Sequence, residues 1–154
     1  MSALDELLGV MARLRDPERG CPWDREQDFR SIVPHTLEEA YEVADAMERG
    51  DREAMRDELG DLLFQVVFYA QIAREEGSFD FEAIARGVVD KLIRRHPHVF
   101  GDRRETTAAS QRATWEAIKA AERAARADTD QPPSALDDVP LGLPALTRRR
   151  KLQS

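Results

Sequence analysis

The sequence has few of the residues that mark a disulfide-stapled, β-rich or membrane-spanning chain. A single cysteine, Cys21, excludes a disulfide within the chain and fits a reducing cytoplasm. Only eight glycines and few β-branched runs argue against an all-β fold. No apolar run approaches the ~18 residues of a membrane span, and no signal-peptide pattern is visible. We therefore expect a cytoplasmic protein without a membrane partner.

Basic residues are outnumbered by acidic ones, which limits the partners that the chain can bind. The formal net charge is −7, whereas stable nucleic-acid binding needs a basic footprint. A phosphorylated small molecule remains compatible with this charge, because a bound cation inverts the local field. The composition, 42% apolar and 34% charged in 154 residues, is that of one soluble helical domain.

Helical periodicity covers most of the chain, so we expect an all-α fold, a four- to five-helix bundle with antiparallel core helices in residues 1–127. The expected helices span 2–15, 36–49, 51–76, 80 to the break at Pro97, and 106–127. Residues 16–24 read as a loop and 25–33 as a short helical turn before Pro34. Residues 128–154 lose the helical period, and we expect a partly disordered tail or linker there.

Five acids gather in two clusters on the two central helices: Glu38, Glu39, Glu42, Glu58 and Asp61. Residues three or four apart share one helix face, and a short break between two helices makes them antiparallel neighbours. We therefore expect the carboxylates to converge on one spot. A hard divalent cation, Mg²⁺, would relieve their repulsion, because it takes oxygen ligands and acts together with substrate phosphates.

Two interpretations of these acids are open on the first helix alone, since acidic runs are usually solvated faces. The second helix favours a metal site. Residues 59–72 are apolar nearly all round, which predicts a buried helix around Glu58 and Asp61. A buried carboxylate has to be paired, protonated or bound to a metal, and few basic residues lie nearby. Thr36 and Glu39 also have the spacing of a capping box, which would draw Glu39 away from a metal.

Four sequence blocks, taken in order, resemble the MazG proteins of the all-α nucleoside triphosphate pyrophosphohydrolases. The blocks are RDPERGCPWD (15–24), TLEEAYEV (36–43), ELGDLLFQVVF (58–68) and RRHPHVF (94–100). The resemblance implies that Mg²⁺, with Mn²⁺ as a possible substitute, is held by Glu39, Glu42, Glu58 and Asp61. It also implies that Glu38 orients or deprotonates the attacking water.

Further along the chain, Lys91 and Arg95 have two interpretations. They complement the dipole at a helix C-terminus, or they hold a triphosphate, which the family resemblance favours. Trp115 is either a core residue or, with Lys119, a family position that stacks on the nucleobase. Trp23 is a packing anchor or a wall of the base pocket. His96 and His98 are expected to anchor a loop, because Mg²⁺ prefers oxygen ligands.

The resulting hypothesis is hydrolysis of a nucleoside triphosphate to the monophosphate and pyrophosphate. The apolar surface of residues 51–76 exceeds what one protomer can cover, so we expect a homodimer centred on that helix. One alternative is a relative selective for one nucleotide, such as dUTP, dCTP or phosphoribosyl-ATP. Another is a non-catalytic helical dimer that acts as a regulatory binding module.

Overall fold

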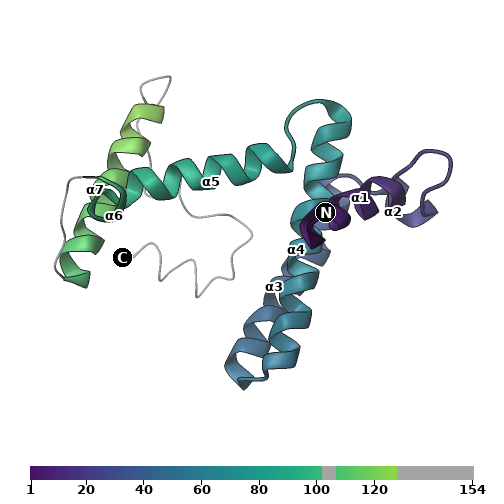
Figure 1. The fold of residues 1–154 in the computed structure, drawn as a ribbon, viewed down its shortest axis with the longest axis horizontal. Helices are drawn as coiled ribbons and strands as arrows, with labels where there is room; N and C mark the ends of the chain where they lie inside the picture. The colour runs from purple at the N-terminus through teal and green to yellow at the C-terminus, as the bar shows by residue number, and fades with distance from the viewer. Residues whose placement is uncertain (102–106, 128–154) are drawn as a thin grey trace. The chain divides into compact units, whose positions relative to one another are not determined.

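The structure, a computed structural model, describes residues 1–101 and 107–127, and every regular element in that part of the chain is an α-helix (Figure 1). The helices are α1 (Ala3–Leu14), α2 (Pro22–Glu26), α3 (Phe29–Arg49), α4 (Arg52–Glu76), α5 (Phe81–Arg95), α6 (Pro97–Phe100) and α7 (Ala108–Ala127). The all-α prediction is confirmed, whereas the four- to five-helix bundle stays a prediction. The expected tail, 128–154, lies outside the described residues.

The chain divides into two compact units, with the boundary inside α5 between Val88 and Val89. The first unit contains α1 to α4 and the start of α5. The second contains the end of α5, α6 and α7. In the described ranges, no helix is both long and apolar enough to cross a bilayer.

The centre of the first unit is a hairpin of α3 and α4, which lie side by side (Figure 1). Gly50 ends α3 with φ of 69°, a left-handed conformation that glycine adopts without strain. Asp51 then caps α4, because its side chain accepts a hydrogen bond from the backbone N–H of Ala54 at 3.2 Å. Gly77 ends α4 in the same left-handed conformation. These helix ends agree with the sequence prediction.

The start of α3 differs from the prediction. The helix begins at Phe29 rather than at Thr36, because Asp28 and Ser31 form a reciprocal capping box. Pro34 lies in the second turn of the helix and does not end it. The missing N–H of Pro34 removes only one intrahelical hydrogen bond near the N-terminus of the helix.

Thr36 therefore does not cap a helix, and the predicted conflict with Glu39 is absent. The Thr36 hydroxyl lies 3.0 Å from Gln65 Oε1 and 2.6 Å from the Tyr69 hydroxyl, so it links α3 to α4. Glu39 consequently lies within the third turn of a longer helix. Its carboxylate is free for a role in the acid cluster.

The predicted loop 16–24 is shorter than expected, because α2 begins at Pro22, where a proline suits the first helical position. The chain before it folds tightly. A Cβ added at Gly20 would overlap the carbonyl oxygen of Leu14. Glycine is therefore required at this close backbone approach.

The core of the first unit joins α1, α3 and α4. Its buried apolar members are Met11, Ile32, Val67, Phe68 and Ile72. Beside them the Arg15 side chain, 8% exposed, forms two hydrogen bonds of 2.8 Å with Glu75. The same guanidinium donates to the carbonyl oxygen of Asp24 at 2.6 Å. Arg15 thus connects α1, α2 and α4.

The second unit joins the end of α5 to α7 by charge. Glu122 of α7 forms ion pairs with Arg94 and with Arg95, at 2.7 and 2.6 Å. The ring of Trp115 lies 4.9 Å from that of His96, whose Nδ1 is 2.7 Å from the carbonyl oxygen of Leu92. Helix α5 ends at Arg95, before Pro97, as predicted.

Candidate functional site

Three of the predicted acids come together on the α3–α4 hairpin. Glu39 of α3 and Glu58 and Asp61 of α4 each place a carboxylate oxygen within 4.8 Å of the other two. The register follows from the turn at Gly50. Glu39 precedes Gly50 by the same number of residues, eleven, as Asp61 follows it. Antiparallel helices therefore bring the two acids to the same level.

Burial makes this cluster unusual for a set of like charges. Glu39 Oε1 and Glu58 Oε2 are shielded from solvent and have no hydrogen-bond partner in the described part of the chain. None of the ion pairs formed between described residues includes these two acids or Asp61, which is exposed. Shielded, unpartnered carboxylate oxygens are the donors that a hard divalent cation takes. The residues present therefore fit such an ion.

The electrostatics of the cluster extend it to Glu42. The adjacent Glu39 carboxyl raises the pKa of Glu58 above its usual range, and burial adds to the rise. Contact with the Glu58 carboxyl, together with its charge, raises the pKa of Glu42. The neighbouring carboxyls thus make ionisation of Glu42 and of Glu58 harder. A bound cation would reverse this effect, because it favours the ionised form of every ligand.

Glu38 is exposed to solvent on α3, next in sequence to Glu39. Adjacent helical residues point in different directions, so Glu38 lies outside the group of three. Its charge still contributes to the raised pKa of Glu42. The cation-binding role of the four acids, and the role of Glu38 toward water, stay predictions.

The four residues predicted to bind substrate all belong to the second unit. Lys91 is exposed on α5. The Arg95 guanidinium stands 5.3 Å above the ring of Trp115 and pairs with Glu122. Lys119 Nζ lies 3.7 Å from a carboxylate oxygen of Glu116. Arg95 and Trp115 are therefore brought together.

A hollow of about 300 Å³ opens beside Trp115 in the same unit. Its lining combines aromatic, amide and basic groups: His96, Ala108, Gln111, Arg112 and Trp115. Such a mixture suits a flat polar molecule that carries negative charge.

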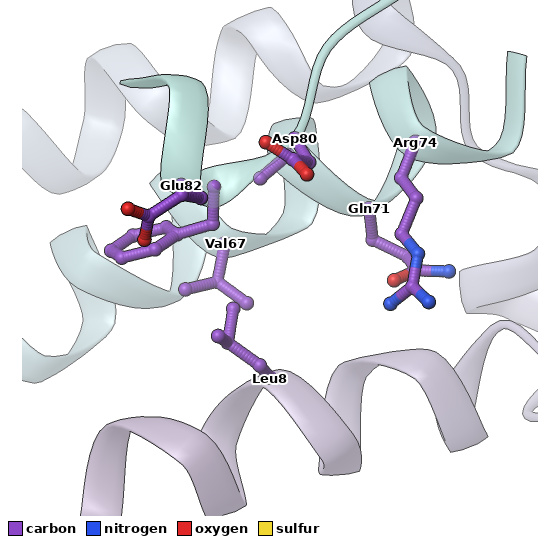
Figure 2. A pocket seen from close by; sticks show the side chains of 8 residues that line it. Leu8, Val67, Gln71, Arg74, Asp80 and Glu82 are labelled. Carbon is purple, nitrogen blue, oxygen red and sulfur yellow. The ribbon is translucent and has the colours of Figure 1, made fainter. Parts of the chain in front are cut away.

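A second hollow, of about 250 Å³, lies in the first unit between α1, α4 and the start of α5. Figure 2 shows Leu8 of α1 facing Val67 of α4, with the side chains of Gln71 and Arg74 close to each other. None of the predicted site residues lines this hollow. It is therefore separate from the acid cluster.

Sequence reasoning missed Glu122, which holds both arginines at the end of α5. No local spacing points to it, because 27 residues separate it from Arg95. It also did not predict the partner of Gln65, which is buried in α4 and bonded to Thr36. Its signal was a polar residue inside an otherwise apolar run.

The fold and the acid cluster define a class: helical proteins in which two antiparallel helices present carboxylates to one site. Comparison with known proteins gives the family. Residues 27–100 match the model of the MazG nucleotide pyrophosphohydrolase domain. This match covers the whole α3–α4 hairpin. Residues 27–100 are therefore a MazG domain.

Relatives agree with this assignment. The chain is 58% identical over 153 residues to a nucleoside triphosphate pyrophosphohydrolase of Escherichia coli K12, covering 99% of this chain and 57% of the relative. It is 43% identical over 149 residues to a nucleoside triphosphate pyrophosphohydrolase/pyrophosphatase MazG of Thermotoga maritima, covering 97% of this chain and 54% of that protein. The chain thus spans little more than half the length of these two curated relatives.

A solved structure also resembles the fold. The crystal structure of a MazG-related protein from Thermotoga maritima matches with a TM-score of 0.62 and 26% sequence identity. The match covers 75% of this chain and 98% of that one.

Proposed function

We propose that this protein is a Mg²⁺-dependent nucleoside triphosphate pyrophosphohydrolase, which releases pyrophosphate and leaves the nucleoside monophosphate. The observation that carries the proposal is the acid cluster, in which Glu39 and Glu58 each have a shielded, unpartnered oxygen. The names of the Escherichia coli and Thermotoga maritima relatives give the reaction class. The biological purpose would be removal of unwanted nucleotides or control of a nucleotide pool.

The cation would be held by Glu39, Glu42, Glu58 and Asp61, with Mn²⁺ as a substitute for Mg²⁺. When bound, the ion supplies positive charge to the phosphates, which lowers the barrier to attack at phosphorus. The donor set supports a hard ion, because all four ligands are carboxylates. Their pKa shifts support it too, because Glu42 and Glu58 are destabilised as anions without a cation.

The residues of the chain then divide the remaining work. A water molecule attacks the α-phosphorus, the bond from that phosphorus to the bridging oxygen breaks, and pyrophosphate leaves. Glu38, which is open to solvent, orients this water and accepts its proton. Lys91 and Arg95 balance phosphate charge. Trp115 and Lys119 bind the base and its surroundings, and the indole face beside Arg95 supports that role.

We further propose that the protein works as a homodimer centred on α4. Leu59 and Leu63, one turn apart on α4, are 45% and 40% exposed, and Leu37 and Tyr41 on α3 are 44% and 59% exposed. Apolar side chains at this spacing form a continuous stripe along a helix. A second copy of the chain would cover it.

The test is pyrophosphate release from a panel of ribo- and deoxyribonucleoside triphosphates, with Mg²⁺ and with EDTA. We expect release only with Mg²⁺, with the matching monophosphate as the other product. Glu58→Gln should reduce turnover at least about 100-fold, because one ligand becomes neutral. Asp57→Asn, at an exposed neighbouring position, should leave turnover unchanged. Mg²⁺-dependent release that survives Glu58→Gln would refute the assigned site.

The same panel separates the narrower alternatives. Turnover of one nucleotide alone would identify a selective enzyme. Absence of release from every nucleotide would contradict the enzymatic proposal and favour a binding module.

A further inference from the structure

The Glu122 carboxylate lies between two guanidinium groups. Its Oε2 accepts hydrogen bonds from Arg94, with the Nε of that residue at 2.8 Å. Its Oε1 accepts from Arg95 Nη2 at 2.6 Å and from Arg95 Nε at 3.2 Å. Each arginine thus presents one edge of its planar fork to a single acid, the geometry that makes arginine–carboxylate pairs specific.

The two pairs differ in exposure. The Arg95 and Glu122 side chains are 17% and 21% exposed, whereas that of Arg94 is 53% exposed. The Arg95–Glu122 pair is therefore shielded from water, and its hydrogen bonds restrict the side chain more than a surface ion pair would.

The same guanidinium is fixed on its flat side by an indole. Arg95 stands 5.3 Å above the Trp115 ring centre, within the range of a cation–π contact. Glu122 follows Trp115 by seven residues, two turns along α7, so both side chains project from the same side of the helix. Glu122 thus holds the edge of Arg95 while Trp115 supports its face.

Charge balance makes this acid necessary for the arrangement. Without it, two adjacent guanidinium cations would repel each other, and Arg95 would regain the rotamer freedom of a long side chain. With it, the group carries one net positive charge on a fixed frame. Binding to a pre-oriented group avoids the ordering cost that a mobile arginine would add.

We propose that Glu122 is a positioning residue for nucleotide binding, which fixes Arg95 on the Trp115 ring before the nucleotide arrives. The inference rests on the proposed function, since that function assigns Arg95 and Trp115 to the substrate. Glu122 itself touches neither phosphate nor base. Its effect is on the arginine, and through the arginine on affinity.

Steady-state kinetics test the inference with three variants. Glu122→Gln should raise KM about tenfold with kcat within about twofold, because a charge-assisted bond is lost from the binding frame. Glu122→Asp keeps the charge and should recover part of the loss. Glu82→Gln is the matched control, because Glu82 also pairs with an arginine, at 3.8 Å, but is 80% exposed. Its KM should equal that of the wild type.

Either of two results would overturn the proposal. A Glu122→Gln variant that behaves like Glu82→Gln would show that the ion pair does not position the arginine. A KM that falls would show that Glu122 competes with phosphate for Arg95.

A spectroscopic measurement reads the position of Arg95 without turnover. The chain has two tryptophans, so Trp23→Phe leaves Trp115 as the only indole emitter. In that background, at pH 8, Glu122→Gln should change the Trp115 emission and raise its quenching by acrylamide, with far-UV circular dichroism unchanged. Unchanged emission and quenching would refute the positioning role. Because this readout needs no substrate, it tests the positioning of Arg95 by Glu122 separately, even where pyrophosphate release fails and the proposed function falls.

Discussion

Thr36 Oγ1 on α3 lies 2.6 Å from the Tyr69 phenolic oxygen on α4. The Thr36 hydroxyl also lies 3.0 Å from Gln65 Oε1. This polar contact joins the two helices about one turn from the acid cluster, since Thr36 precedes Glu39 by three residues and Gln65 follows Asp61 by four. The helices that supply the carboxylates are therefore locked to each other next to the carboxylates.

Removing this lock should lower stability. We expect Thr36→Val to reduce the free energy of unfolding by about 1–3 kcal/mol, because it leaves the polar groups of Gln65 and Tyr69 partly unpaired. Urea denaturation checks this value. Tyr69→Phe should cost less after Thr36→Val than alone, because the shared bond is already gone. Full additivity of these two variants would contradict the contact.

The acid cluster should destabilise the protein when no cation is bound. The pKa of Glu58 is raised above the ordinary value of 4.5 in the folded state, so ionisation weakens the fold at pH 7. This penalty disappears as pH falls through the raised pKa. We expect Glu58→Gln to raise the thermal midpoint in EDTA at pH 7, with the gain over wild type shrinking towards pH 4.5.

Added Mg²⁺ should reverse the order of these two proteins. The wild type should gain stability with Mg²⁺ through preferential binding to the folded state, and Glu58→Gln should gain little. Differential scanning fluorimetry at a series of Mg²⁺ concentrations measures both effects. Asp57→Asn should follow the wild type throughout. An equal Mg²⁺ response in all three proteins would place the ion elsewhere.

Arg15 should tolerate neither alanine nor lysine. Its guanidinium makes two hydrogen bonds to Glu75 and one to the backbone of Asp24, and a lysine ammonium cannot reproduce this fork. We expect Arg15→Lys to lower the free energy of unfolding by about 2 kcal/mol. Chemical denaturation gives the value, and Arg19→Lys at an exposed position serves as the reference. A lysine variant as stable as the wild type would mean that charge alone suffices.

The pairing of Glu122 should be visible in acid. Hydrogen bonds from Arg95 and then Arg94 lower the pKa of Glu122 from 4.5 to about 2. Its stabilising contribution is therefore complete above about pH 4.5 and is lost as pH falls towards 2. We expect the difference in thermal midpoint between wild type and Glu122→Gln to be constant from pH 7 to 5 and to close below pH 4. A difference that is independent of pH down to 2 would contradict the ion pair.

Local signals predicted the hairpin well. Gly50, Asp51 and Gly77 mark its helix ends by residue type alone, because each fills a position with a strict backbone or capping requirement. The register of the acids follows from the count of residues on either side of Gly50. The hypothesis about the reaction came from the family blocks.

The start of α3 was beyond such local reasoning, because two capping signals compete. Thr36 with Glu39 has the ideal spacing, and Asp28 with Ser31 is a less familiar pair. In the structure, α3 begins after Asp28, so it is longer than predicted. The Thr36 hydroxyl instead contacts Gln65 and Tyr69 of the neighbouring helix. Tertiary packing decides this, and it leaves no mark within a short window of sequence.

The partners of the charged residues were equally hidden. Apolar spacing predicted that residues 51–76 carry more apolar surface than one protomer covers, and Leu59 and Leu63 are partly exposed in one chain. Periodicity does not say which surface covers them. Arg95 was expected near phosphate. Its contact with Glu122 joins two helices, α5 and α7, that are far apart in the sequence. Helical periodicity predicts on which face of its helix a residue lies, whereas its contact partner on another helix is known only from the fold.

The turn at Gly50 has a consequence for how the protein reaches its folded state. Glu39 and Asp61 are only 22 positions apart along the chain. Contacts over such short separations close rapidly and favour fast folding. We therefore expect the acids to meet early, as the α3–α4 hairpin forms, and we expect their mutual repulsion to slow this step when no cation is bound. Fast hairpin formation and a carboxylate-rich site thus place opposite demands on the same residues.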